Sequence, residues 1–300
     1  MKYPIQFVNK VIGAFGEVGE EWLNNLESTI QHYLEKWDLQ LEGPVDNLSY
    51  NYVLKVIDEN GNKAILKLGV PNYDFENEIR TLQAYDGKGC AKLLIADAKH
   101  GAMLLEYLHP GKMLSKVHDE QTAIQHFAKV WTSIRTSVMK NDSHPAISDW
   151  LVAFDSYSEK NPEEEGGISL DFIQQAKTYY KDLVDTSRGN ELLHGDLHHE
   201  NILYSESKGW MAIDPKGVIG DSYFDVISFL INQLFHHDNP KTVLKNRVEM
   251  LCEELQLEKA RLLKAAIVMA TLYACWGVED KDPDWADAYT CAQWFKEFLL

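Results

Sequence analysis

LLHGDLHHENILYSESKGWMAIDPKG, residues 192–217, gathers three histidines, two aspartates and an asparagine into 26 residues. Its second half has the pattern of a β-hairpin, with short apolar runs on either side of a polar, glycine-containing turn. The expected parts are an apolar run at 191–193, a strand at 202–204, a turn at 205–209 and a second strand at 210–213. In an antiparallel hairpin the start of the first strand lies opposite the end of the second. Asn201 is therefore expected beside Asp214.

Three kinds of chemistry fit this stretch when it is taken alone. In the first, Asp196 accepts the proton of an incoming hydroxyl while Asn201 and Asp214 hold Mg²⁺ on nucleotide phosphates, because Mg²⁺ prefers oxygen ligands and keeps several waters. In the second, histidines and an acid bind zinc or a two-metal centre for hydrolysis. Those ligands would be His194, Asp196, His198 and His199. In the third, the same groups form a structural hydrogen-bond network without turnover. The zinc interpretation needs further ligands, and the sequence has no second His-x-His and no His-Glu-x-x-His cluster.

Length and composition indicate a soluble globular protein of one bilobal domain or two domains. The chain has 300 residues, of which 45% are hydrophobic and 25% are charged. Its longest nearly apolar run, 265–276, is shorter than the roughly 20 residues that cross a bilayer, so it predicts a buried helix and no membrane partner. The N-terminus lacks the continuous apolar segment of a secretory signal, and a cytoplasmic location is expected. Four scattered cysteines without a CxxC pair predict neither disulfides nor a zinc site.

The net charge of −17 excludes nucleic acid as the expected partner, because phosphate binding needs a basic surface. The charge is uneven, with −5 over residues 1–105 and −12 over residues 106–300. The second part could therefore attract a cationic ligand. The alternative is that the acids only keep the protein soluble. The sequence makes no prediction of the oligomeric state.

The first third of the chain is expected to be rich in strands. A short strand-like start precedes an amphipathic helix, and Asn60-Gly61 indicates a tight hairpin turn. Asp74 is expected to cap a second helix, and Gly87 to end it. The expected elements are a helix at 17–39, strands at 48–57 and 64–68, a helix at 74–85, and strands at 92–96 and 102–108.

Lys67 and Glu78 form a candidate pair in this part of the chain. Glu78 lies on one helical stripe with Phe75 and Leu82. An acid on a buried stripe needs a cation, and Lys67, in the preceding strand, is the nearest candidate. The alternatives are a strand lysine that faces water and an acid at the edge of the stripe.

Beyond His109-Pro110-Gly111 the chain is expected to be helical, apart from the hairpin. Apolar residues recur there at helical spacing, which indicates core packing. The expected helices lie at 119–139, 148–158, 170–184, 223–235, 242–255, 259–276 and 283–298.

The order of these parts resembles that of phosphoryl-transfer enzymes with a protein-kinase-like fold. The parts are a strand lysine (Lys67), a helix glutamate (Glu78), a linker (106–111), His-x-Asp with an asparagine five residues beyond the aspartate, and a strand that ends in an aspartate (Asp214). HGDLHHENIL followed by AIDPKGVIGD is similar to the aminoglycoside and hydroxyurea antibiotic kinase family. AILKLG, FENEIRTLQAYDGKGCAKLL and LLEYLHPG also look like that family's small lobe and hinge.

The resemblance covers about residues 45–230 and implies an α+β, bilobal, protein-kinase-like fold. The N-terminal lobe, 1–108, would hold a small antiparallel sheet with a helix, preceded by an extra N-terminal helix. The C-terminal lobe, 109–300, would be mainly helical and carry the catalytic loop and the acceptor site.

The resemblance also implies catalytic and metal-binding roles. Asp196 matches the base that orients the acceptor hydroxyl, and Asn201 and Asp214 match the two magnesium ligands. Lys67, paired with Glu78, matches the lysine that contacts the α- and β-phosphates of ATP.

Further roles follow from the same resemblance. Adenine would bind main-chain groups of the linker near Glu106 and Leu108. His194 would hold the catalytic loop through main-chain contacts, and Asp225 would brace the backbone of that loop.

The chain also departs from the protein-kinase pattern. It has no Gly-x-Gly-x-x-Gly, and the segment expected over the phosphates reads DNLSYNYV, with Ser49, Tyr50 and Asn51 as candidate phosphate contacts. Six residues separate Asp214 from Asp221, where the next helix is expected to begin. That spacing leaves no room for a long segment that docks a peptide, so a small molecule is the expected acceptor.

The expected function is therefore that of an ATP- and Mg²⁺-dependent kinase that phosphorylates a hydroxyl of a small molecule. The resemblance implies an aminoglycoside of the streptomycin type. Acids that could contact such a cation are Asp221, Asp225, Asp284 and Asp287. The alternatives are a kinase of hydroxyurea or of another metabolite, and a nucleotide-binding protein of the same fold that phosphorylates nothing.

Overall fold

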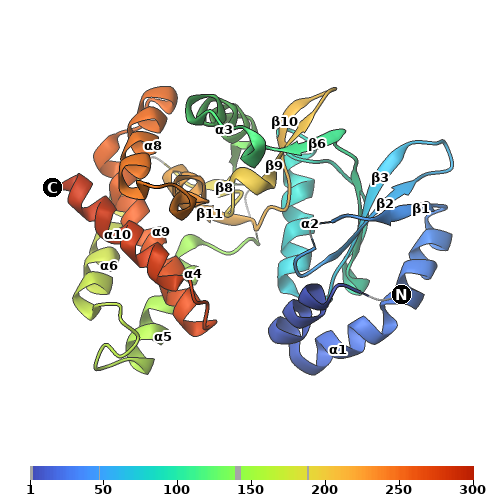
Figure 1. Cartoon of the computed structure of the whole chain (residues 1–300), viewed down its shortest axis with the longest axis horizontal. Helices are drawn as coiled ribbons and strands as arrows, with labels where there is room; N and C mark the ends of the chain where they lie inside the picture. The colour runs from blue at the N-terminus through green and yellow to red at the C-terminus, as the bar shows by residue number, and fades with distance from the viewer. Residues whose placement is uncertain (1–2, 47, 139–142, 188) are drawn as a thin grey trace. The chain divides into compact units, whose positions relative to one another are not determined.

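A five-stranded antiparallel sheet lies at the centre of the first of two units of the chain (Figure 1). Its order is β1-β2-β3-β5-β4. The strands are β1 (Gln40–Pro44), β2 (Tyr52–Ile57), β3 (Lys63–Leu68), β4 (Leu93–Asp97) and β5 (Ala102–Glu106). Alternate residues of β2 are buried, as expected when one face of a strand covers a core.

The computed structural model describes residues 3–46, 48–138, 143–187 and 189–300. The first unit consists of Met1–Gly111 and Tyr204–Met211. The second consists of Lys112–Leu203 and Ala212–Leu300. The division at residue 108 expected from the sequence stays a prediction.

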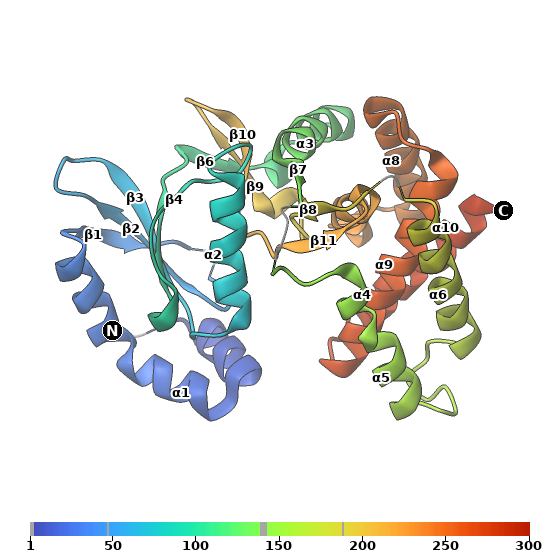
Figure 2. The same ribbon diagram turned by 180° about the vertical axis from the view of Figure 1, so that it is seen from behind.

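Helices cover both faces of the five-stranded sheet. On one face α1 (Ile5–Lys36) buries Phe7 and Ile30 in a single hydrophobic core with residues of β2 and β3. α1 is interrupted at Gly16, whose φ of 56° and ψ of −134° are not helical. Figure 2 shows α2 (Tyr73–Tyr85) on the opposite face from α1.

The N-terminal part differs from its sequence expectation in three places. The chain enters α1 directly after Pro4, where a strand-like start was expected, because proline is well suited to the beginning of a helix. The edge strand β1 was not expected, since Gly43 and Pro44 are poor strand formers. The strand expected from residue 48 begins at Tyr52, so that the described residues 48–51 precede β2 without belonging to a strand.

The cap of α2 also differs from its expectation. Asn72, and not Asp74, precedes the helix, and its side chain accepts a hydrogen bond from the N–H of Phe75 at 2.8 Å. Asp74 lies in the first turn, where an acid is favourable beside the positive end of the helix dipole. The helix ends at Asp86, which is left-handed, one residue before Gly87.

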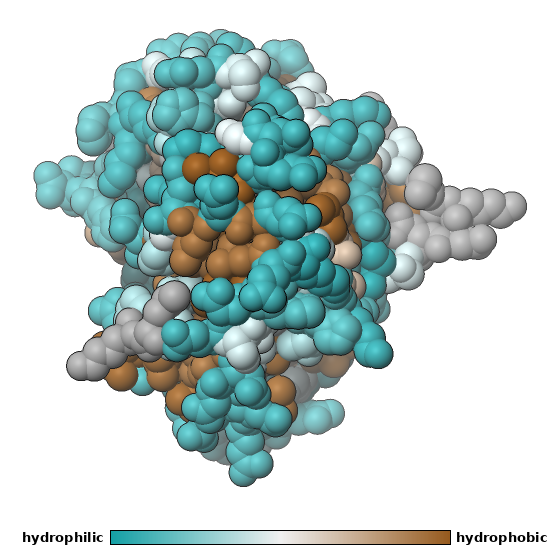
Figure 3. Space-filling model, turned by 90° about the vertical axis from the view of Figure 1, so that its right-hand side faces the viewer, coloured by the Kyte–Doolittle hydropathy of each residue, from teal (hydrophilic) through white to brown (hydrophobic). Residues whose placement is uncertain are grey.

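The face in Figure 3 is mostly hydrophilic around a group of hydrophobic side chains. The large apolar residues of the first unit that are exposed are Ile5, Ile12, Val18, Leu41, Tyr50, Tyr73, Leu94 and Ile95. They come from α1, β1, α2, β4 and the segment 48–51, and exposed apolar residues are common on protein surfaces.

Two small sheets carry the loops around residues 192–217. The first has the order β10-β9-β6 and the second the order β11-β8-β7. Their strands are β6 (Pro110–Met113), β7 (Thr136–Ser137), β8 (Glu191–Leu193), β9 (Ile202–Ser205), β10 (Gly209–Ala212) and β11 (Val218–Gly220). The expectation of only helices outside the hairpin is therefore wrong. β7, β8 and β11 have two or three residues each, which is too short to show a period of two.

The remaining second unit is helical. Its α-helices are α3 (Glu120–Ile134), α4 (Ile147–Trp150), α5 (Val152–Lys160), α6 (Leu170–Asp185), α7 (Ile227–Ile231), α8 (Pro240–Leu255), α9 (Lys259–Glu279) and α10 (Trp285–Leu299). Short 3₁₀ turns are η1 (Ala98–His100), η2 (Leu114–Lys116), η3 (His199–Asn201), η4 (Ser222–Val226) and η5 (Leu234–His236), of which η1 lies in the first unit. The helix expected at 119–139 stops at Ile134, and Met139 lies outside the described residues.

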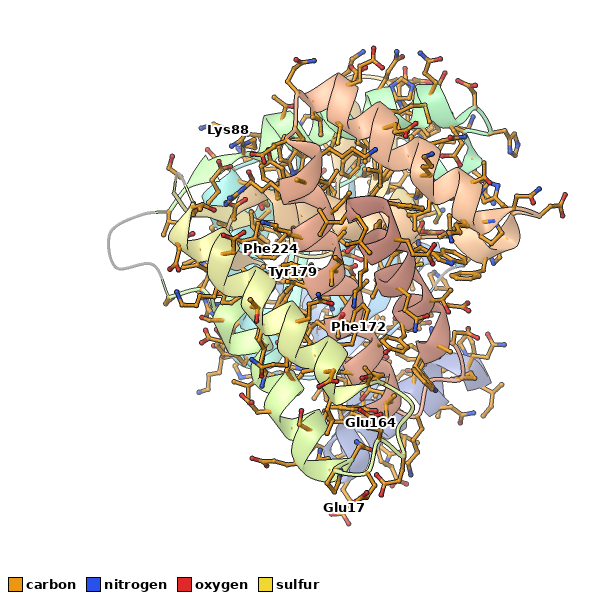
Figure 4. The ribbon with its side chains drawn as sticks, turned by 90° about the vertical axis from the view of Figure 1, so that its left-hand side faces the viewer. Glu17, Lys88, Glu164, Phe172, Tyr179 and Phe224 are labelled. Atoms are coloured by element: carbon orange, nitrogen blue, oxygen red, sulfur yellow. The ribbon has the colours of Figure 1, made fainter. Side chains whose placement is uncertain are left out.

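The helix α9 is the core of this unit. By length and composition it could cross a membrane, but 67% of its 18-residue apolar window is buried inside the protein. α6 and α10 pack against it, and Phe172 of α6 meets Tyr289 of α10 edge-on at 5.3 Å. Figure 4 views this side of the helical unit and labels Phe172 on α6 and Phe224 in η4. Packing in a protein core accounts for the apolar character of α9.

Candidate functional site

Lys67 and Glu78 form a buried ion pair within the first unit. The Lys67 Nζ lies 2.6 and 2.8 Å from the two carboxylate oxygens of Glu78, and the side chains are only 4% and 10% exposed. Leu66 and Leu68 belong to the core beneath α1, so alternation along β3 directs Lys67 to the face that α2 covers. The alternative of a lysine that faces water is therefore wrong.

The candidate catalytic loop follows β8 directly, and His194 links it to the hairpin. The His194 ring is fully buried. Its Nε2 donates to the carbonyl of Ile213 at 2.9 Å, and its Nδ1 accepts from the N–H of Asp196 at 3.3 Å. Burial lowers the pKa of His194 to about 4, so the ring is neutral at pH 7 with its proton on Nε2. One side chain thus joins the loop of Asp196 to the strand end that precedes Asp214.

Asp225 braces the first turn of the same loop. Its two carboxylate oxygens accept the N–H groups of Gly195 at 2.7 Å and His194 at 3.2 Å. Burial raises the pKa of Asp225 to about 6, although these two donors act in the opposite direction. Gly195 has a φ of 80°, and a Cβ there would lie 3.0 Å from the indole of Trp150. This turn therefore favours glycine.

The hairpin places Asn201 and Asp214 next to each other, as its pattern predicts. The N–H of Ile213 donates to the carbonyl of Asn201 at 2.9 Å. The Asn201 Nδ2 donates to the carbonyl of Asp196 at 2.9 Å, which directs its Oδ1 to the other side of the amide. Asp214 is exposed and has a φ of 56°, a strained value for a residue other than glycine.

The donors in this loop fit a hard cation better than zinc. An amide oxygen and a carboxylate, completed by phosphates and waters, are sufficient for Mg²⁺. Zinc needs three or four protein ligands, and in the part of the chain that the structure describes no three His, Cys, Asp or Glu side chains are grouped to hold a metal ion.

The other two histidines of the motif point to different partners. The His198 Nε2 lies 3.7 Å from an Asp196 oxygen and its Nδ1 lies 3.0 Å from a Glu200 oxygen. Burial lowers the pKa of His198, but Glu200 and Asp196 outweigh this effect and raise it. His199 is stacked on Phe229 at 4.1 Å, and burial lowers its pKa to about 4. The histidines therefore serve as parts of the loop.

The expected nucleotide residues lie in the first unit. The Glu106 N–H donates to the carbonyl of Lys92 at 3.0 Å, and its carboxylate accepts from the N–H of Lys92 at 2.7 Å and from the ammonium of Lys208 at 2.6 Å. Leu108 is buried. Ser49 lies exposed in the segment 48–51, where Asn51 packs so closely on Gly69 that a Cβ at residue 69 would clash with its Oδ1.

Two of the acids expected to contact an acceptor are engaged elsewhere. Asp225 holds the catalytic loop, and Asp221 is buried in an ion pair with Arg261 while it caps η4. Both carboxylates are committed to the fold. Asp284 and Asp287 remain, and burial together with the neighbouring acid Asp284 raises the pKa of Asp287.

Sequence patterns did not identify the residues of the helical part that contact this loop. Phe229, Asn232, Gln233 and Arg247 are far from the motif along the chain, and no motif includes them. No spacing rule relates them to the motif, because tertiary packing alone brings them together.

The chain resembles solved kinases in fold. A choline kinase from Streptococcus pneumoniae has a TM-score of 0.65 and 16% identity, covering 91% of this chain and 99% of that one. An aminoglycoside phosphotransferase solved with ADP and hygromycin B has a TM-score of 0.63 and 11% identity, covering 91% and 98%. The predicted protein-kinase-like α+β fold is thereby confirmed.

The sequence relatives identify the family more specifically than the solved structures do. A streptomycin 6-kinase from Streptomyces glaucescens is 28% identical over 274 residues, which cover 89% of this chain and 88% of the relative. A hydroxyurea phosphotransferase from Kitasatospora aureofaciens is 31% identical over 238 residues, which cover 77% and 68%. Residues 36–281 match the family described as "Aminoglycoside/hydroxyurea antibiotic resistance kinase". The chain therefore belongs to the aminoglycoside/hydroxyurea antibiotic resistance kinases, and it is a small-molecule phosphotransferase that acts on hydroxyl groups.

Proposed function

We propose that this protein transfers the γ-phosphoryl group of ATP to a hydroxyl of a cationic small molecule, with an aminoglycoside of the streptomycin type as the first candidate. ATP use follows from the kinase family. The proposal rests on two hydrogen bonds of Asn201. Its side-chain amide donates to the main-chain carbonyl of Asp196, and its main-chain carbonyl accepts from the N–H of Ile213, the residue before Asp214. Two relatives of this family are streptomycin 6-kinases.

Each residue of the loop has a separate task in this proposal. The Asp196 side chain is 36% exposed, so an acceptor hydroxyl can reach it, and its carboxylate orients that hydroxyl and takes its proton. Asn201 and Asp214 hold Mg²⁺, which when bound offsets the negative charge of the phosphates. His194 fixes the position of Asp196 relative to the strand end before Asp214, through its hydrogen bonds to the main chain of Asp196 and Ile213.

The nucleotide is proposed to bind residues of the first unit. Lys67 contacts the α- and β-phosphates while Glu78 fixes the position of its ammonium. Because the Glu106 N–H is engaged by Lys92, adenine would use the carbonyl of Glu106 and the N–H of Leu108. Ser49 and Asn51 remain candidate contacts of the phosphates.

The acceptor is proposed to be cationic because of the charge of the chain. Residues 106–300 carry a net charge of −12, and Asp284 and Asp287 are candidate contacts. Hydroxyurea is the second candidate, since a hydroxyurea phosphotransferase is 31% identical to this chain. Hydroxyurea is uncharged and needs no acidic contact. Since the reaction consumes ATP, we propose a cytoplasmic location.

The test is acceptor-stimulated ATP turnover by the purified protein. Streptomycin, other aminoglycosides, hydroxyurea, choline and simple sugars are supplied in turn with ATP and Mg²⁺, and ADP release and the phosphorylated product are measured. Stimulation by streptomycin supports the first candidate, and stimulation by hydroxyurea alone supports the second. If no acceptor raises ATP turnover, the kinase proposal fails and a purely nucleotide-binding protein is favoured.

A variant of Asp196 tests the proposed base directly. Asp196→Asn keeps the size of the side chain but removes its basicity, so kcat should fall by about 10²- to 10⁴-fold. ATP binding, measured by calorimetry with Mg²⁺ present, should change little. Full activity in this variant would exclude Asp196 as the base.

A further inference from the structure

The turn after α7 has an unusual backbone. Asn232 is extended, with a ψ of 135°, and Gln233 is left-handed, with a φ of 56° and a ψ of 13°. The left-handed conformation is unfavourable for a residue other than glycine. The contacts of Asn232 and Gln233 show what holds the backbone of this turn in place.

Arg247 of α8 holds the main chain of the turn. Its side chain is 2% exposed, and its Nη1 donates to the carbonyls of Leu230 at 3.0 Å and Asn232 at 2.8 Å. Its Nε and Nη2 donate to the two carboxylate oxygens of Glu120, at the start of α3, at 2.9 and 2.8 Å. The guanidinium therefore saturates carbonyls at the end of α7, where the helix cannot pair them itself. Glu120 balances its charge.

The side chains of the turn reach the catalytic loop. The Asn232 Oδ1 accepts from the His199 Nδ1 at 2.9 Å. The Gln233 Nε2 donates a hydrogen bond to the Oε1 of Glu200, the residue after His199. Phe229, one turn earlier, stacks on the ring of His199. Three residues of one short segment thus hold His199 and Glu200.

His199 and Glu200 lie in η3, which connects Asp196 to Asn201. A single 3₁₀ turn has poor hydrogen-bond geometry of its own, so external contacts set its position. A displacement of η3 would move the Asn201 amide relative to Asp196. The turn at 232–233 is thus connected by hydrogen bonds to the candidate metal site.

We propose that Asn232 and Gln233 are positioning residues for phosphoryl transfer, which fix η3 and thereby the Asn201 side chain. This inference rests on the proposed kinase function. It predicts that loss of either side chain reduces turnover and the response to Mg²⁺, while the affinity for ATP through the first unit is retained.

The experiment uses Gln233→Gly, which removes the amide and relieves the left-handed backbone at the same time. The matched control is Gln256→Gly. Gln256 is also left-handed, with a φ of 54°, but it is exposed at the end of α8. In Gln233→Gly we expect kcat to fall about tenfold and the half-saturating Mg²⁺ concentration to rise several-fold. The KM for ATP should stay within about twofold in both variants, and Gln256→Gly should match the wild type in kcat and Mg²⁺ response. Asn232→Leu, of similar size, should resemble Gln233→Gly.

A second measurement separates this inference from the kinase proposal. Hydrogen exchange of the amides at 196–203 should be faster in Gln233→Gly than in the wild type or in Gln256→Gly, whether or not an acceptor is known. Faster exchange in a protein without acceptor-stimulated turnover would support the link between the turn and the loop and overturn the catalytic part. Unchanged exchange, or unchanged kcat and Mg²⁺ response in an active enzyme, would overturn the positioning role.

Discussion

Lys67 combines a structural and a proposed catalytic task in one ammonium group. Helical spacing placed Glu78 on an apolar stripe and so predicted its pairing, which the structure shows at 2.6 Å. The face to which Lys67 points was not predictable from spacing, because it depends on the register of β3 with its two neighbours. That register opposes Lys67 to Val53 on β2 and to Met103 on β5.

Substitution can separate the two tasks of Lys67. Lys67→Met removes the ammonium that balances the buried Glu78 carboxylate, so the free energy of unfolding should fall by about 3 kcal/mol. It should also raise the KM for ATP at least about tenfold. Urea unfolding and steady-state kinetics measure the two effects.

The double variant Lys67→Met/Glu78→Leu is the control for stability. Removing both charges should restore most of the lost stability, since a buried pair is often replaceable by apolar groups. The KM for ATP should remain high. If the double variant recovered a normal KM, Lys67 would have no direct part in nucleotide binding.

At the level of elements, Arg247 joins α3, α7 and α8 through one side chain. Helical periodicity predicted these helices approximately, but it could not predict an arginine in their midst, because an arginine is usually exposed. The same limit explains the missed strands. Thr136 of β7 pairs with Leu192 of β8, 56 residues away, and such distant pairing leaves no local pattern.

The buried ion pair of Arg247 and Glu120 should contribute to the free energy of unfolding. Glu120→Ala leaves the Arg247 cation, 2% exposed, without its carboxylate, so the free energy of unfolding should fall by about 3 kcal/mol or more. Glu297→Ala is the matched control, because Glu297 pairs with Lys241 of the same helix α8 but both are about half exposed. That variant should lose less than about 1 kcal/mol. Equal losses in urea unfolding would contradict the difference in burial.

Over the whole molecule, the family resemblance carried by the order of the motifs predicted the fold, and the hairpin pattern predicted which loop residues come together. They could do so because HGDLHHENIL and AIDPKG are local, and a hairpin needs few residues to bring Asn201 beside Asp214. They could not predict that His199 is buried and neutral, or that Asp221 pairs with Arg261 and not with an acceptor. Those properties depend on burial by helices more than 20 residues further along the chain.

Burial of His194, His199 and Asp225 predicts how stability depends on pH. Burial lowers the pKa of each histidine from 6.5 to about 4, so the unfolded chain binds their protons first and stability falls as the pH drops from 6.5 towards 4. Burial raises the pKa of Asp225 from 3.8 to about 6, so this group has the opposite effect in nearly the same range. Each shift corresponds to roughly 3 kcal/mol.

The combined contribution of these three groups is a loss of about 3 kcal/mol in the free energy of unfolding between pH 7 and pH 4, equal to the share of one histidine. Urea unfolding at pH 7, 5.5 and 4 measures it. A comparison of pH 7 with pH 8 is the control, where these three groups contribute no change. A stability that rose on acidification would contradict the burial of the two histidines in their neutral form.

The hairpin tip at Tyr204–Met211 belongs to the first unit, although the residues on both sides of it belong to the second. The first unit is therefore not a contiguous piece of chain. During synthesis its last segment leaves the ribosome 100 residues after Gly111, which at 5–20 residues per second is a delay of roughly 5–20 s. The nascent first unit must wait through that interval for its final strand residues, and no single cut in the chain releases it whole.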